Sequence, residues 1–96
     1  MGNQVRAHTI ITGKVQGVFF RMETQRAARS HGVTGWVRNK LDGSVEAVFE
    51  GGETDVKDTL RWCRTGPPHA LVSRVDVTWQ DYAGEFEAFE VTYQLH

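Results

Sequence analysis

The sequence predicts an α+β fold in which an antiparallel sheet carries two helices on one face. Residues 4–14 alternate between apolar and polar side chains, as a half-buried strand does. Residues 20–31 and 54–65 instead place their apolar side chains at helical spacing. Between these helical segments, Asp42-Gly43 separates two alternating runs and indicates a hairpin. The predicted order is therefore β-α-β-β-α-β, followed by one short additional strand.

A change of periodicity separates the first strand from the first helix. In residues 4–14 (QVRAHTIITGK), the side chains expected on one face are Val5, Ala7, Thr9 and Ile11. From residue 20 onward the spacing becomes helical, and the face expected to be buried comprises Phe20, Thr24, Ala27, Ala28 and His31. Gly32 follows and is expected to end the helix, because glycine readily adopts the left-handed conformation found there.

The remaining elements follow from the same signals. Strands are expected at residues 33–40 (VTGWVRNK) and 44–51 (SVEAVFEG), and the second helix at about 54–65. Its apolar stripe consists of Val56, Thr59, Leu60 and Cys63. A further strand is expected at 70–80, and a short last strand within 86–94.

The topology predicts which polar residues meet. A right-handed crossover through the first helix makes the first two strands run in the same direction, so their carboxyl ends lie at one edge of the sheet. With the third strand between them, these ends are about 10 Å apart, which is two interstrand spacings. The loop leading to Arg21 follows the first strand, and Arg38-Asn39-Lys40 ends the second. We therefore expect Arg21 and Asn39 to share a rim.

The loop before Arg21 has the features of an anion site. Successive backbone N–H groups in a glycine turn that leads into a helix form a concave anion cradle. Gly17 lets this backbone approach a ligand closely. A cation in the first helical turn is locally unfavourable, and a bound anion would offset that cost at Arg21. The alternative is an ordinary strand-to-helix turn with a solvated arginine, which spacing alone leaves open.

Asn39 is the second candidate residue, and its amide can orient a water although it cannot act as a general base. Its alternative role is to satisfy local backbone groups beside a turn. The other polar residues suggest no site. The four histidines show no ligand spacing, so no metal site is expected. The acidic residues expected to be solvated are Glu46, Glu50, Glu53, Asp55 and Asp58.

Composition narrows the functional classes. The chain has 96 residues, enough for one compact domain, with 40% hydrophobic and 24% charged residues. A net charge of -1 supplies no overall basic field for nucleic acid or anionic lipid. No apolar run reaches the roughly 18 residues of a membrane span, and no signal-peptide core is present, so we expect a cytoplasmic protein. Cys63 is the only cysteine, which rules out an intramolecular disulfide.

Two long motifs resemble the signatures of a known family. The run Gly13-Lys14-Val15-Gln16-Gly17-Val18-Phe19-Phe20-Arg21 resembles the first signature of the acylphosphatase family. The run from Gly35-Trp36-Val37-Arg38-Asn39 through Asp42-Gly43-Ser44-Val45-Glu46 resembles its second. The resemblance covers essentially the whole chain. It implies a ferredoxin-like fold and a single acylphosphatase-like domain over residues 1–96.

The resemblance also implies a function and a set of site residues. We expect a hydrolase that splits acyl phosphates into a carboxylate and inorganic phosphate, working as a monomer without metal or other cofactor. In this family's pattern, Arg21 corresponds to the phosphate-binding arginine and Asn39 to the water-orienting asparagine. The phosphate cradle corresponds to the backbone of Val15, Gln16, Gly17, Val18, Phe19 and Phe20.

Two other functional classes stay open at this point. The same frame hosts RNA-binding and regulatory domains, but those that bind RNA present basic sheet faces and exposed aromatic residues, whereas the third predicted strand, SVEAVFEG, is acidic. The chain could also retain the anion site as a sensor of phosphorylated metabolites. A turnover assay separates a sensor from an enzyme.

Overall fold

The computed structural model describes residues 3–93 and has the predicted order of elements. The strands and helices are β1 (Gln4–Lys14), α1 (Phe20–Ser30), β2 (Thr34–Asn39), β3 (Val45–Gly52), α2 (Glu53–Thr65), β4 (Leu71–Gln80) and β5 (Phe89–Val91). Each lies within one or two residues of the range expected from periodicity, apart from the final strand, which is shorter. Gly32 follows α1 with a φ of 70°, the left-handed geometry expected of a residue that ends a helix.

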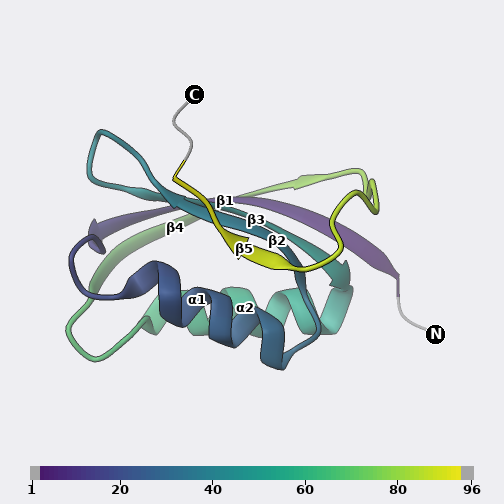
Figure 1. Ribbon diagram of the computed structural model, residues 1–96, viewed down its shortest axis with the longest axis horizontal. Coiled ribbons are helices and arrows are strands. Elements are labelled where there is room, and N and C mark those ends of the chain that lie inside the picture. The colour runs from purple at the N-terminus through teal and green to yellow at the C-terminus, as the bar shows by residue number, and fades with distance from the viewer. Residues whose placement is uncertain (1–2, 94–96) are drawn as a thin grey trace.

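The strands form one sheet in the order β4-β1-β3-β2-β5, with both helices packed side by side on one face (Figure 1). The split β-α-β, or ferredoxin-like, arrangement is therefore confirmed, with β3 between β1 and β2. The first four strands pair in antiparallel fashion, as predicted. The short β5 pairs with β2 in parallel and makes the sheet mixed.

The core lies between the sheet and the helices. Ala7 and Ile11 of β1 are fully buried on the helix-facing side, as alternation predicts. In α1 the buried side chains are Phe20, Thr24 and Ala28, which repeat every four residues along one face. Across the sheet, the rings of Phe49 and Phe89 stack with centroids 5.4 Å apart, so β5 is anchored to the core. Burying one such side chain contributes about 1.5–3 kcal/mol.

This topology places the carboxyl ends of β1 and β2 at the same edge. Both strands run antiparallel to β3, so they run in the same direction. The loop from β1 into α1 and the turn from β2 into β3 therefore lie on the same side of the molecule (Figure 1). The rim expected from the sequence is present.

The expectation of solvated carboxylates was wrong for two residues of β3. Glu50 is fully buried, and Glu46 is 9% exposed. Glu50 accepts hydrogen bonds from Arg6 and from the backbone N–H groups of Ala83 and Gly84, because the segment between β4 and β5 folds over this face. Burial would raise the pKa of Glu50, but these donors outweigh it and hold the pKa below its ordinary value.

Glu46 is held in a similar way by two partners on neighbouring strands. His8 lies 2.6 Å from one carboxylate oxygen, and the Nε of Arg38 donates to the other at 2.7 Å. Burial again opposes ionisation, and these contacts lower the pKa of Glu46 overall. Arg38, adjacent to Asn39, is thereby fixed on the sheet face opposite the helices.

Within residues 3–93, no helix is long and apolar enough to cross a membrane.

Candidate active site

The loop between β1 and α1 is anchored by buried valines. Val15 is 1% exposed and Val18 is 8% exposed, whereas Gly17, which lies between them, and Phe19, which follows Val18, are exposed to solvent. Gly17 has a φ of 74°, and Phe19, the residue that caps α1, has a φ of 63° and a ψ of 22°. A left-handed conformation at a residue other than glycine costs about 1–3 kcal/mol and indicates a loop held in shape by its surroundings.

The backbone of this loop retains free donors. Among the described residues, none of the N–H groups of residues 15–19 donates a hydrogen bond to another protein group. These N–H groups lie directly before the N-terminus of α1, whose partial positive charge adds to theirs. These N–H groups are therefore not used within the described protein and remain available as donors.

Arg21 is the second residue of α1 and is half-buried at the edge of this loop. Its guanidinium carbon lies 4.9 Å from the centroid of the Tyr93 ring, in cation–π contact. None of the ion pairs found among residues 3–93 involves Arg21. The aromatic ring packs against the guanidinium from one side, and no acidic side chain in the described part of the chain pairs with its charge. Arg21 can therefore pair with an anionic ligand.

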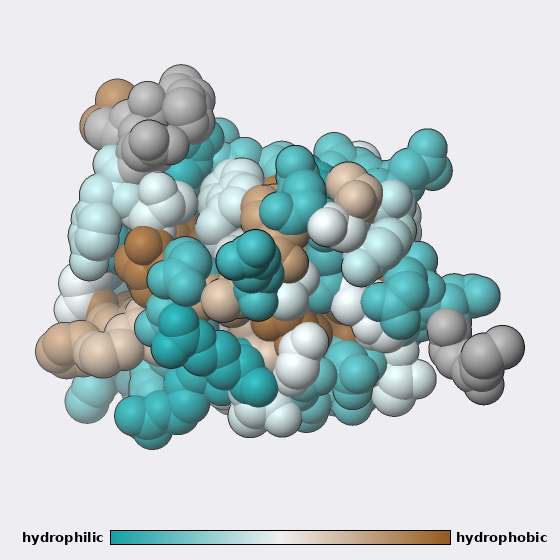
Figure 2. Space-filling view, turned by 45° about the vertical axis from the view of Figure 1, so that its right-hand side comes forward, coloured by the Kyte–Doolittle hydropathy of each residue, from teal (hydrophilic) through white to brown (hydrophobic). Residues whose placement is uncertain are grey.

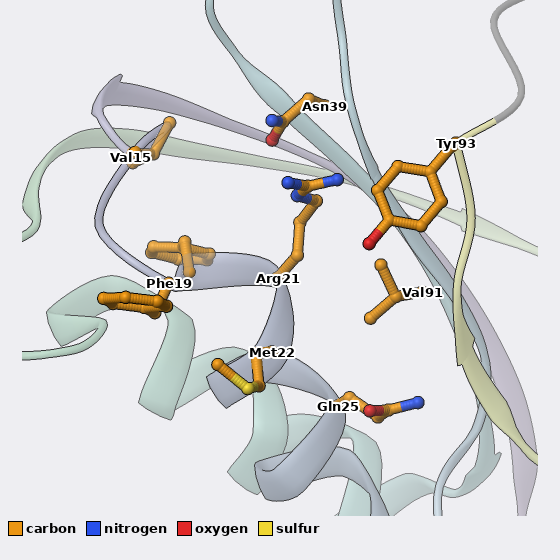
Figure 3. A pocket seen from close by; sticks show the side chains of 10 residues that line it. Val15, Phe19, Arg21, Met22, Gln25, Asn39, Val91 and Tyr93 are labelled. Atoms are coloured by element: carbon orange, nitrogen blue, oxygen red, sulfur yellow. The ribbon is translucent and has the colours of Figure 1, made fainter.

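Asn39 is the last residue of β2, and its Cα pairs with that of Val45 across the hairpin. Its Oδ1 is buried and has no hydrogen-bond partner among the described residues. An unpaired buried acceptor costs about 1–3 kcal/mol, so it points to a ligand or water that donates to it. Figure 3 shows this amide directed toward the Arg21 guanidinium.

Gln16 connects the loop to the hairpin. Its Nε2 donates to the carbonyl oxygen of Lys40 at 2.8 Å and to that of Ser44 at 2.9 Å. The same hairpin is closed by a hydrogen bond from the Lys40 N–H to the Ser44 carbonyl. The Gln16 side chain therefore fixes the anion loop to the residues that directly follow Asn39.

A cavity of about 490 Å³ joins these groups. Of the residues expected from the sequence, those that line it are Val15, Gly17, Phe19, Phe20, Arg21 and Asn39. Gln16 and Val18 do not line it, because the first reaches to the hairpin and the second packs into the core. Sequence reasoning missed four lining residues, which are Met22, Gln25, Val91 and Tyr93. A helical signal was available for Gln25, since position 25 lies one turn beyond position 21.

Other chemistries find little support in the described part of the chain. No group of three or more His, Cys, Asp or Glu side chains in residues 3–93 could hold a metal ion. Cys63 is buried in α2, and burial raises the pKa of its thiol to about 12. A thiol with such a pKa is not a nucleophile at neutral pH. The site therefore consists of an arginine, an amide and a loop of backbone donors.

Comparison with known proteins identifies relatives over nearly the whole chain. The family model described as Acylphosphatase matches residues 7–91. An acylphosphatase of Pelotomaculum thermopropionicum is 54% identical over 91 residues, which cover 95% of this chain and 99% of the relative.

Solved structures agree with the sequence match. The structure of an acylphosphatase from Coxiella burnetii superposes with a TM-score of 0.89 at 36% identity, covering 94% of each chain. The crystal structure of acylphosphatase from Bacillus subtilis gives a TM-score of 0.90 at 31% identity, covering 93% of this chain and 99% of that one.

Proposed function

The chain belongs to the acylphosphatase family and is an enzyme that hydrolyses acyl phosphates, and we propose that Arg21, Asn39 and the backbone of residues 15–20 carry out the reaction. Arg21 and the loop hold the phosphoryl group. Asn39 orients the water that attacks phosphorus in line with the departing carboxylate. The products are the free carboxylate and inorganic phosphate.

The unpartnered Oδ1 of Asn39 is the observation that carries this proposal. A buried amide oxygen beside an arginine that has no counter-ion among residues 3–93 offers an acceptor for one proton of a water molecule. A water that donates to this oxygen keeps a lone pair free to attack a phosphoryl group bound at the guanidinium. Positioning of this kind contributes several kcal/mol, with an upper range of about 7–11 kcal/mol.

Arg21 and the loop supply the charge stabilisation. Phosphoryl transfer proceeds through a loose transition state whose charge spreads over the non-bridging oxygens. The guanidinium and the free N–H groups of residues 15–19 match those oxygens as donors. Removing one donor from a comparable oxyanion site costs about 3–4 kcal/mol.

The leaving group explains why so few side chains suffice. The bond between phosphorus and the carboxyl oxygen breaks, and its electron pair departs with the carboxylate, which needs neither a proton nor a metal. The bond from water to phosphorus forms, and a phosphoryl oxygen takes the proton that the water loses. No covalent phosphoenzyme arises on this route, and no protein base is required.

The decisive experiment measures inorganic phosphate released from benzoyl phosphate with a chelator present. The parent protein should turn over, and Asn39→Ala should lower kcat at least a hundredfold because the water loses its orientation. Asn3→Ala, which changes the other asparagine at the far end of β1, is the matched control and should keep full activity. Undiminished turnover by folded Asn39→Ala would contradict the assigned role.

Arg21 is tested by binding as well as by rate. Phosphate at ten times its Kd should stabilise the parent by about 1.4 kcal/mol, which is about 6–11 °C in Tm for a domain of this size. Arg21→Ala should abolish most of this shift and lower kcat/KM by about 10²–10³. Arg26→Ala removes an exposed arginine of the same helix and should leave both unchanged. If phosphate raised the Tm of Arg21→Ala as much as that of the parent, the proposal that Arg21 holds the phosphoryl group would be refuted.

A sensor of phosphorylated metabolites would show the rise of Tm with phosphate but no turnover, and the family relationship does not favour this alternative.

We further propose that the chain folds as one domain and acts as a monomer in the cytoplasm. The single core cluster of residues 3–93, to which both helices and all five strands contribute, supports one domain. A mass above one protomer in size-exclusion chromatography with light scattering would oppose the monomer.

A further inference from the structure

The cavity at Arg21 is larger than the reaction itself requires. A phosphoryl group with its oxygens and one attacking water amount to roughly five water-sized atoms, or about 50–75 Å³ at the cavity volume that holds one water each. The cavity measures about 490 Å³. More than half of its volume therefore remains for another part of the substrate.

The remaining part of the cavity has mostly apolar walls; the polar exception is Gln25, whose Nε2 donates to the carbonyl oxygen of Phe89 at 3.1 Å. Met22 lies beside Arg21 on α1, Val91 lies on β5, and Tyr93 follows it. Figure 3 shows Met22 and Val91 on the opposite side of the Arg21 guanidinium from Asn39, with the Tyr93 ring standing alongside. Met22 is 51% exposed and Tyr93 is 76% exposed, so an incoming group can reach both.

The geometry of in-line attack decides which part of the substrate occupies this space. The attacking water and the leaving oxygen stand on opposite sides of phosphorus. If Asn39 holds the water, the carboxylate departs away from Asn39. Met22 and Val91 line the part of the cavity away from Asn39, so an acyl group that leaves away from Asn39 moves toward them.

We propose that Met22, Val91 and Tyr93 form a subsite for the acyl group, and that it selects uncharged, apolar acyl groups over acyl groups that carry a second charge. This inference rests on the proposed function of Arg21 and Asn39. Arg21 is the one charged side chain among the residues that line the cavity. The phosphoryl group already pairs with the Arg21 guanidinium. A second anionic group on the substrate therefore contacts mainly apolar side chains and loses hydration without gaining a second cationic partner.

The apolar side chains Met22, Val91 and Tyr93 line one cavity with the anion loop, which suits a small acyl group. In Figure 2 most of the visible surface is hydrophilic, and apolar side chains show only in small patches between hydrophilic ones. Protein partners bind larger continuous apolar areas. The apolar wall instead adjoins the anion loop inside one cavity, where a molecule with an anionic and an apolar end contacts both.

Kinetics on a series of substrates tests the subsite. The parent protein should be assayed with acetyl, butanoyl, hexanoyl and benzoyl phosphate, and with succinyl monophosphate as the charged member. Full burial of a methylene is worth about 0.8 kcal/mol, or roughly fourfold, and an open cavity gives about half of that free energy. We expect kcat/KM to rise about tenfold from acetyl to hexanoyl phosphate, and succinyl phosphate to fall below butanoyl phosphate.

Variants locate the effect. Met22→Ala should flatten the dependence on chain length and lower kcat/KM for benzoyl phosphate about fivefold to tenfold, with less than a twofold change for acetyl phosphate. Met22→Lys should improve succinyl phosphate about twofold to fivefold relative to the parent, since it adds a second cation. Leu41→Ala is the matched control, because Leu41 is 89% exposed and does not line the cavity. Circular dichroism confirms that each variant is folded.

The outcomes separate this inference from the proposed function. If no acyl phosphate is hydrolysed, the proposed function fails. If all are hydrolysed with equal kcat/KM, or if Met22→Ala changes acetyl and benzoyl phosphate alike, the subsite is wrong while the phosphate site stands. A preference for succinyl phosphate in the parent also overturns the inference. Dependence on chain length that disappears in Met22→Ala and persists in Leu41→Ala supports it.

Discussion

Replacing Gln16 by methionine tests whether the anion loop and Asn39 act as one unit. The Nε2 of Gln16 donates to the Lys40 and Ser44 carbonyl oxygens at 2.8 and 2.9 Å. These carbonyl groups belong to the turn that directly follows Asn39. Methionine has nearly the same length and no charge, so Gln16→Met removes both donors without adding a repulsive group near the bound phosphate.

The expected effect has a stability part and a catalytic part. Two hydrogen bonds contribute about 1–3 kcal/mol together, and the lower half applies here because Gln16 is only half-buried and water can replace it. A misplacement of about 1 Å at a catalytic group costs up to about 100-fold in rate. The hairpin retains its own hydrogen bond between Lys40 and Ser44, so a smaller shift and a loss of about tenfold in kcat are expected.

Three measurements on Gln16→Met distinguish positioning from simple destabilisation. Phosphate should still raise Tm by nearly the parental amount, because Arg21 and the loop amides remain. KM should change less than threefold while kcat falls about tenfold at a temperature well below Tm. Gln4→Met, an exposed position on β1, is the control. A variant with lower stability but parental kcat would show that Gln16 only holds the loop in place and would refute the positioning argument.

Two further predictions concern the fold that supports the site. Glu50→Gln should lower the free energy of unfolding by about 1–3 kcal/mol at pH 7, because a buried carboxylate loses its charge-assisted bonds to Arg6 and the segment after β4. The folded-state pKa of Glu50 lies below the ordinary 4.5, so its ionic stabilisation is present above that pH and disappears as pH falls through the folded-state pKa. Chemical denaturation at several pH values should therefore show that Glu50→Gln loses less stability in acid than the parent does. The control Glu87→Gln should show the same dependence of stability on pH as the parent. Gly66→Ala should cost about 2–3 kcal/mol in the same assay, because φ is 68° and an added Cβ would lie 2.6 Å from Cε2 of Phe20. Equal stability of Gly66→Ala and the parent would show that this backbone relaxes freely.

The order of elements could be predicted because local patterns determine it. The alternation in residues 4–14 and the four-residue repeat from Phe20 to Ala28 each identify one face, and burial of these faces follows from the hydrophobic effect. The handedness of the crossover then predicts that β1 and β2 are parallel. The parallel pairing of β5 could not be predicted in this way, since three residues carry no periodic signal and the partner strand β2 is far away in sequence.

Burial of Glu46 and Glu50 was missed for a related reason. Both stand on the face of β3 away from the helices, where alternation predicts solvent. The segment after β4, which supplies N–H groups to Glu50, has no regular pattern and contacts β3 from more than thirty positions away. The lining residues Val91 and Tyr93 were missed for the same reason, because they reach the site only through the pairing of β5 with β2, which is distant in sequence. Contacts between segments distant in sequence determine both features.

Three features that are locally unfavourable lie around one cavity. Phe19 is the one residue other than glycine with a positive φ in the described chain. Arg21 places a cation at the positive end of a helix, and Asn39 buries an oxygen without a partner. The backbone strain opposes stability by about 1–3 kcal/mol in the free protein, the misplaced cation by about 0.3–1 kcal/mol and the unpaired oxygen by about 1–3 kcal/mol. An anion between the loop and Arg21 offsets the second cost, and a water on Asn39 offsets the third. The buried side chains of Val15 and Val18 and the hydrogen bonds from Gln16 to the hairpin keep these three features in place before the substrate binds.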